Sequence, residues 1–167
     1  MRALHALPLL ALLLIAPPAA AQPADTTAAA ASAETAVDTS AQVAAARSAA
    51  EAWLAHVDAG KYGKSWEEAA EPFKSQLTRD QWKKAVEQVE AQYGTPQSRT
   101  FGEGAYTTSL QNAPEGRYVR LVYDAQYANP GADQPVHSMR ELVVMMREDD
   151  AWKAIGYRAR PAKNDQQ

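Results

Sequence analysis

Cysteine is absent from all 167 residues of the chain. The protein therefore has no disulfide, no thiolate zinc or iron–sulfur site, no cysteine nucleophile and no cysteine for lipid attachment. A strong charge of either sign is also missing, because 17 basic side chains stand against 20 acidic ones and leave a net charge of −3. This balance argues against a polybasic membrane anchor and against nucleic acid as a partner.

Long hydrophobic runs are missing as well. Residues 7–15 form the main apolar run, which is well short of the roughly 20 residues that a membrane-spanning helix needs. Arg2 precedes the run, and Ala19-Ala20-Ala21 follows it in the small-residue pattern that signal peptidases accept. We predict a signal peptide over residues 1–21 with cleavage before Gln22. This predicts a periplasmic or secreted protein with no membrane span after cleavage.

Large side chains are scarce in the next segment. Alanine occurs 36 times in the chain, and 20 of these alanines lie in the first fifty residues. Residues 22–39 consist mainly of Ala, Thr, Ser and Pro, so they cannot bury enough apolar surface to offset the entropy of ordering. We predict a disordered linker over 22–39, whose alanines favour transient helix. An α+β domain over 40–160 and a tail over 161–167 would follow.

The first half of this domain has helical periodicity. Apolar residues recur at helical spacing from Val43 to Val57, with Thr39 as the cap and Gly60 as the stop. A short second helix is expected over 65–70, ended by Pro72. A third helix is expected between the capping residue Thr78 and Gly94. The pattern therefore predicts three helices.

The second half alternates with a period of two residues. Strands are expected over 98–108, 117–129, 136–148 and 152–160, with a glycine-marked bend in the first and a central position for the third. Helices followed by strands predict an α+β fold rather than an alternating one. We expect three helices packed on the concave face of a strongly curved, four-stranded antiparallel sheet, which together enclose a cone-like interior.

A scattered set of residues resembles the bacterial family catalogued as domain of unknown function 4019. The set comprises Trp53, Asp58, Gly60, Tyr62, Ser65, Trp66, Phe73, Lys74, Trp82, Gly94, Ser98, Arg99, Gly116, Tyr118, Val119, Glu141, Trp152, Gly156 and Tyr157. The resemblance covers about 45–160 and implies an exported domain with a nuclear-transport-factor-2-like cone fold. It supplies no catalytic residue. Asp150 and Leu142 depart from the glycine and threonine that the family usually has at these positions.

The candidate catalytic and cofactor motifs in this sequence each lack a required residue. The segment 63–65 ends like a phosphate-binding loop, but Asp58 stands where the first glycine is required. Gly102 and Gly104 lack the third glycine and the helix of a dinucleotide loop. His137 and Glu141 share a strand face, yet no third ligand accompanies them. We therefore predict no catalytic motif, no cofactor and no metal.

The residues with the best claim to a ligand are the large aromatics and two charged side chains. The candidate ligand-binding set is Trp53, Tyr62, Trp66, Trp82, Arg99, Tyr118, Glu141 and Tyr157. The aromatics, together with Tyr123, would either line a pocket or simply fill the core, and their helical and strand spacing favours the core. Arg99 and Glu141, if buried, are expected to pair with each other, because an unpaired buried charge is costly.

These residues are compatible with two functions from different classes. The first is a non-enzymatic module that binds a small ligand or a protein, in the interior or on the outer face of the sheet. The second is a small-molecule enzyme of isomerase or hydrolase type, with Glu141 or Asp58 as the base. Arginines on the strands suggest an anionic ligand or simply a solvated face. Because cone folds often pair through the sheet, a dimer stays open.

Overall fold

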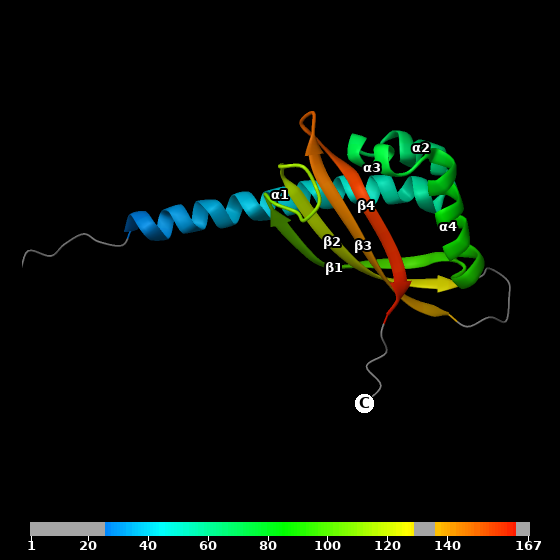
Figure 1. The fold of residues 1–167 in the computed structure, drawn as a ribbon. Coiled ribbons are helices and arrows are strands. Elements are labelled where there is room, and N and C mark those ends of the chain that lie inside the picture. The colour runs from blue at the N-terminus through cyan, green and yellow to red at the C-terminus, as the bar shows by residue number, and fades with distance from the viewer. Residues whose placement is uncertain (1–25, 129–135, 163–167) are drawn as a thin grey trace, which may run out of the picture.

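The computed structural model describes residues 26–128 and 136–162 as four helices followed by four strands (Figure 1). The elements are α1 Thr26–Asp58, α2 Tyr62–Glu67, α3 Glu71–Gln76, α4 Arg79–Tyr93, β1 Thr95–Thr107, β2 Tyr118–Ala128, β3 His137–Glu148 and β4 Ala151–Pro161. The predicted signal peptide, the 129–135 connection and most of the predicted tail lie outside the described residues.

Helix α1 is longer than the sequence pattern predicted. It begins at Thr26 rather than near Ser40, so much of the segment assigned to a disordered linker is helical. Alanine has the highest intrinsic helix propensity, which explains why the helix continues through this segment. In Figure 1 the N-terminal part of α1 extends beyond the sheet. The predicted cap at Thr39 was wrong, whereas Gly60 does stop the helix in a left-handed conformation, with φ 68°.

The short helices also differ from the prediction. One helix was expected over 65–70, and the structure has two, α2 and α3. Pro72 was read as a helix end, but it occupies the first turn of α3. Proline is tolerated there because the first backbone N–H groups of a helix have no partner inside the helix. The described residues therefore contain four helices rather than three.

Helix α4 confirms its predicted boundaries. The Thr78 side chain accepts a hydrogen bond from the Gln81 backbone, and the Gln81 side chain accepts one from the Thr78 backbone, which completes a capping box. Gly94 caps the other end with φ 82°. Trp82 and Val86 are the buried residues of its apolar face.

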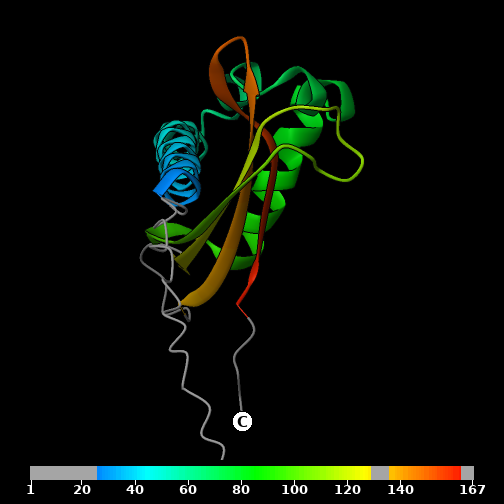
Figure 2. The same ribbon diagram turned by 90° about the vertical axis from the view of Figure 1, so that its left-hand side faces the viewer.

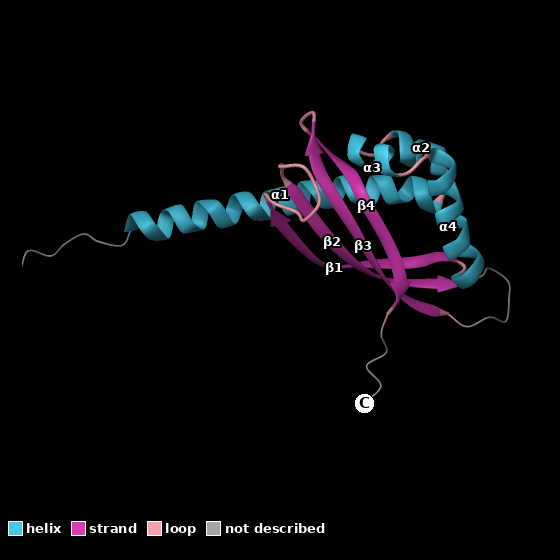
Figure 3. Cartoon of the chain, in the orientation of Figure 1, coloured by secondary structure: helices cyan, strands magenta, loops and turns pink. Residues whose placement is uncertain are grey.

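The four strands form one antiparallel sheet in the order β1-β2-β3-β4 (Figure 3). This order confirms the α+β class and places the doubly apolar β3 inside the sheet. A register shift between Phe101 and Glu103 confirms the predicted irregularity at Gly102. Gly104 has another role, because a Cβ there would lie 2.5 Å from Val43 of α1. Glycine thus lets α1 approach β1 closely.

One face of the sheet carries the core. The residues Val119, Leu121 and Tyr123 of β2 are buried on this face, as their alternation predicted. Helix α1 contacts all four strands, and α3 contacts β4. Figure 2 views α1 nearly along its axis, beside the twisted sheet. Within the described residues, no helix is both long and apolar enough to cross a membrane.

Candidate functional site

Five polar side chains meet at the inner face of the sheet, one from α1 and one from each strand. They are Asp58 of α1, Arg99 of β1, Tyr127 of β2, Glu141 of β3 and Tyr157 of β4. We call them the inner network. Because each residue comes from a different element, only the folded chain brings them together.

Glu141 is the centre of the inner network and is fully buried. Its Oε2 accepts from Arg99 Nε, and its Oε1 accepts from Arg99 Nη2 at 3.1 Å. The hydroxyl groups of Tyr127 and Tyr157 also donate to Oε1, the latter at 2.8 Å. Four donors therefore surround this carboxylate, which meets the requirement that a buried charge be paired and hydrogen-bonded.

Arg99 connects this carboxylate to the end of α1. Its Nη1 and Nη2 donate to the two carboxylate oxygens of Asp58 at 2.7 and 3.0 Å. Burial disfavours the charged guanidinium, but the hydrogen bonds and charges of Asp58 and Glu141 outweigh burial and raise the pKa of Arg99. The arginine is thus a permanent cation between two carboxylates. The predicted Arg99–Glu141 pair is confirmed.

The two tyrosines are held in their neutral form. Their hydroxyl oxygens lie 3.1 Å apart. Burial first, and then the charge of Glu141, raise the pKa of Tyr127 and of Tyr157 above the ordinary value of 10.0. Both hydroxyls therefore act as hydrogen-bond donors across the neutral pH range.

The predicted aromatic residues mostly form a packed core. The ring centroid of Trp53 lies 5.5 Å from that of Trp82 and 5.9 Å from that of Tyr157. Both indole N–H groups donate to Ser65, one to its carbonyl oxygen at 2.7 Å and one to its hydroxyl at 2.9 Å. Phe73 packs edge-on against both tryptophans. These contacts are those of core residues.

Tyr62 and Trp66 lie at the margin of this core. The Tyr62 hydroxyl donates to Glu90 Oε2 at 2.7 Å, and the Trp66 indole donates to the Leu77 carbonyl at 2.6 Å. Both rings are partly buried against the core cluster. Burial and the Glu90 carboxylate raise the pKa of Tyr62. Each polar group is thus satisfied by the protein itself.

Tyr118 does not belong with the other candidates. It belongs to the opposite set of alternating β2 residues from Leu121 and Tyr123, and it is buried beneath the loop that precedes β2. Its hydroxyl donates to the Pro114 carbonyl, and its ring lies near Gly116. The alternation of β2 alone would have assigned it to the outer face. The expectation that Tyr118 lines the interior was therefore wrong.

Two spaces of different size border the inner network. A void of about 10 Å³ lies beside Asp58, Tyr127 and Tyr157. This volume corresponds to roughly one water molecule. A shallow hollow of about 190 Å³ lies between α4 and β4, next to Trp82 and Tyr157.

A larger groove lies between α1 and β1, with a volume of about 540 Å³. Val43 and Ala44 of α1 and Phe101 of β1 line it. The Arg47 guanidinium lies 4.4 Å from the centroid of the Phe101 ring at its rim. The sequence reasoning missed this groove because it depends on where α1 crosses the sheet.

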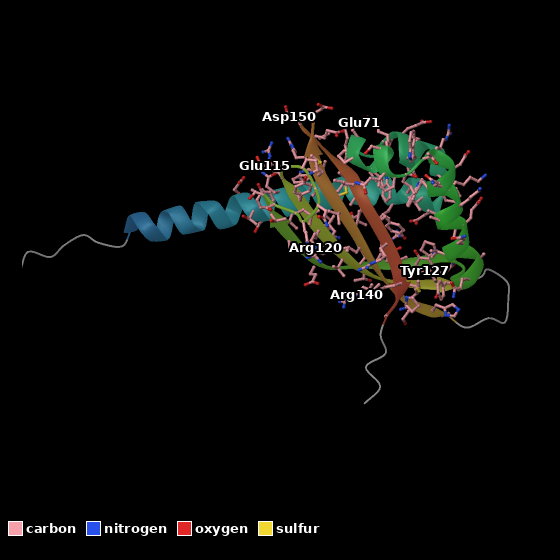
Figure 4. All side chains as sticks on the ribbon, in the orientation of Figure 1. Glu71, Glu115, Arg120, Tyr127, Arg140 and Asp150 are labelled. Carbon is pink, nitrogen blue, oxygen red and sulfur yellow. The ribbon has the colours of Figure 1, made fainter. Side chains whose placement is uncertain are left out.

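The outer face of the sheet has a hollow of about 150 Å³ with a different lining. Its lining residues are Glu103, Arg120, Val122, Arg140, Leu142, Arg158 and Arg160. In Figure 4 the side chains of Arg120 and Arg140 lie on the sheet away from α2, α3 and α4. We call this feature the arginine hollow.

The described residues contain no group of three or more His, Asp or Glu side chains arranged to hold a metal ion. His137, considered in the sequence as a ligand, instead packs edge-on against Tyr93, with ring centroids 5.4 Å apart. Glu141, the other residue considered as a metal ligand, instead accepts hydrogen bonds from Arg99 and the two tyrosines.

Two members of the inner network were not predicted in their observed roles. Asp58 was named as a candidate base and not as an ion-pair partner of Arg99; in the structure it pairs with Arg99, which lies 41 residues away in the chain. Tyr127 was not among the candidate residues named from the sequence. The alternation that places Tyr123 inside also places Tyr127 inside, and a buried tyrosine hydroxyl requires a partner. That rule could have indicated a polar partner for Tyr127.

No curated protein matches this chain in a sequence search. The sequence model of a family described as a protein of unknown function, DUF4019, matches residues 49–157. The matched range runs from the second half of α1 into β4 and includes the whole inner network from Asp58 to Tyr157. The chain therefore belongs to the DUF4019 family.

Proposed function

We propose that this chain is an exported domain that acts by binding rather than by catalysis, and that its binding surface lies outside the aromatic interior. The state of Glu141 carries the proposal. This carboxylate is fully buried and is paired with Arg99 and with the hydroxyl groups of Tyr127 and Tyr157, so neither of its oxygens is exposed to a substrate in solution. The void beside Tyr127 and Tyr157 holds roughly one water molecule, and Glu141 does not line the larger hollow between α4 and β4.

Asp58 is the second carboxylate considered as a base. Its side chain is about one-third exposed, and both of its oxygens accept hydrogen bonds from Arg99. This geometry supports a role as a counter-charge that positions Arg99 and joins the end of α1 to β1. The enzyme alternative would require Asp58 to leave Arg99.

The cone-like fold is part of the same proposal. Contacts of α1 with all four strands, and the burial of the inner strand residues beneath it, support a nuclear-transport-factor-2-like arrangement. In this proposal the helices and the inner face of the sheet form a structural core, and the outer face of the sheet is available to a partner.

A small apolar ligand in the α1–β1 groove is a second candidate. The groove volume of about 540 Å³ lies within the range of roughly 300–1,000 Å³ that small-molecule sites occupy. The apolar side chains of Val43, Ala44 and Phe101 suit such a ligand, and the Arg47 side chain at the rim could orient a polar end.

Methionine methyl NMR distinguishes these readings on the full chain. Met139 and Met145 are buried in the interior, whereas Met146 alternates to the outer face. The neutral apolar probe N-phenyl-1-naphthylamine is titrated while the three ¹³C-methyl signals are followed. We expect the Met139 and Met145 signals to stay in place. Saturable shifts of these two signals would mean an open interior pocket and would overturn the proposal.

The groove candidate has its own variant in this titration. Ala44→Trp fills the groove, and Ala52→Trp adds the same ring to an exposed position on α1. Probe binding that Ala44→Trp abolishes and Ala52→Trp retains would assign the binding function to the groove. If neither variant changes probe binding, the groove is not the binding site.

Export is tested separately by N-terminal sequencing of the protein recovered from the periplasm or medium of a bacterial host. We expect the sequence to begin at Gln22. An intact Met1 in the cytoplasmic fraction would refute the signal peptide.

A further inference from the structure

We propose that the arginine hollow binds a small polyanion through its phosphate or carboxylate groups. Arg120, Arg140, Arg158 and Arg160 would supply the hydrogen bonds. The inference deepens the proposed binding function and rests on it. It names the binding surface as the outer face of the sheet and the ligand class as multivalent oxyanions.

Strand register brings the four arginines together although they are up to forty residues apart. Arg140 of β3 lies directly opposite Arg160 of β4, and Leu142 lies opposite Arg158. Arg120 of β2 lies opposite Val144 on the other side of β3. Alternation sends the side chains of these residues to the same face of the sheet. The cationic groups therefore surround an apolar floor.

That floor is formed by two paired residues at the centre of the sheet. Val122 of β2 lies opposite Leu142 of β3, and both are half-buried. Apolar side chains beneath a ring of charges exclude water and strengthen the field that an anion meets. Leu142 thus provides part of the floor of the hollow.

Positive charge is in excess at the arginine hollow. Glu103 is the single acidic residue in its lining, and Asp124 at its edge lies 3.6 Å from Arg140. Among the described residues, no carboxylate oxygen lies within 4.0 Å of a guanidinium nitrogen of Arg120, Arg158 or Arg160. The chain as a whole has a net charge of −3. The excess is therefore local to this face.

Arg140 and Arg160 are expected to repel each other when no anion lies between them. Side chains that are directly opposite on antiparallel strands have Cβ atoms about 4.5–5.5 Å apart, and like charges there repel. A bound oxyanion would turn this repulsion into attraction. The rigid guanidinium fork matches two oxygens of a phosphate or carboxylate, which a lysine cannot do.

The size of the hollow limits the ligand. A volume of about 150 Å³ is below the range of drug-sized pockets but accommodates one or two oxyanion groups. Pyrophosphate and citrate represent the two chemical sources of such groups, and both carry several negative charges at pH 7.

Isothermal titration calorimetry of the full chain with pyrophosphate and, separately, citrate tests the inference at low ionic strength. The side-chain Nε–H NMR signals of the arginines locate the bound anion. We expect saturable binding that shifts the signals of Arg158 and Arg160, and that weakens as salt rises. The anion that binds more tightly identifies the phosphate or carboxylate class.

A charge-matched pair of variants provides the control. Arg158→Gln with Arg160→Gln removes two charges from the hollow, and we expect binding to weaken about tenfold or more. Lys83→Gln with Lys84→Gln removes two charges from the exposed face of α4, and we expect less than a twofold change. Equal weakening by both pairs, or no binding of either anion to the wild-type chain, would overturn the inference.

Thermal unfolding supplies a readout that does not depend on the calorimetry. Without an anion, Arg160→Gln should unfold at a higher temperature than the wild type, because the repulsion with Arg140 is removed. Saturating anion should raise the unfolding temperature of the wild type and not that of the double arginine variant. If the anion tests fail and the apolar probe leaves the Met139 and Met145 signals in place, the anion site at the arginine hollow is refuted and the proposed function is not. Shifts at Met139 and Met145 would refute the proposed function instead.

Discussion

Replacement of Glu141 by glutamine should destabilise the protein although the two side chains have nearly the same shape. The glutamine oxygen can take the place of Oε1 and keep the hydrogen bonds from Tyr127, Tyr157 and Arg99 Nη2. Its nitrogen then takes the place of Oε2, where Arg99 Nε donates. Two donors face each other there, and the buried arginine keeps Asp58 as its one counter-charge.

The expected cost follows from these contacts. Breaking a buried ion pair costs about 3–5 kcal/mol. Because Asp58 still neutralises Arg99, Glu141→Gln should cost about 3 kcal/mol, near the lower end of that range. Arg99→Gln leaves the Glu141 charge with two tyrosine donors alone, so it should cost about 4 kcal/mol. The double variant should lose about 2 kcal/mol less than the sum of the single losses, since the residues are in direct contact.

Urea unfolding at pH 7 measures these losses through the fluorescence of the four tryptophans. Glu87→Gln, at an exposed position on α4, makes the same chemical change and should cost less than about 0.5 kcal/mol. If both single replacements in the inner network cost less than about 1 kcal/mol, the network is not the buried ion pair described here. Additive losses in the double variant would refute the coupling between Arg99 and Glu141.

Three further predictions concern local elements of the fold. Asp150→Gly should stabilise the β3–β4 turn by about 0.5 kcal/mol in urea unfolding, because Asp150 has φ 60° and glycine adopts this conformation without strain; a loss of stability would contradict this. Thr78→Ala should cost about 1 kcal/mol through loss of the α4 cap, and Thr78→Ser should restore most of it. Tyr127 and Tyr157 have raised pKa values in the folded chain, so their stabilising contribution is complete below pH 10 and is lost as the pH rises beyond it. Urea unfolding between pH 8 and 11 should show this fall, and a free energy of unfolding that is constant to pH 11 would contradict it.

The amino-acid sequence by itself determined the class of fold and most element positions. Local physics explains this success, because a capping box at Thr78, a left-handed glycine at residue 60 and alternation along β2 act within a few residues. Local rules failed where two of them compete. Alanine propensity extended α1 back to Thr26 against the low-complexity argument, and Pro72 started a helix instead of ending one.

The tertiary structure alone decided how the charged residues are used. The pairing of Arg99 with Glu141 was predicted because an unpaired buried charge is costly. The ion pair between Asp58 and Arg99 depends instead on where α1 ends relative to β1. The arginine hollow likewise depends on strand register, which places Arg140 opposite Arg160 and leaves Arg158 beside an apolar floor. Register and helix crossing arise from contacts between residues that are distant in the chain. A pattern read along the chain contains no record of those distances, so the ion pairs and the hollow became visible only in the folded protein.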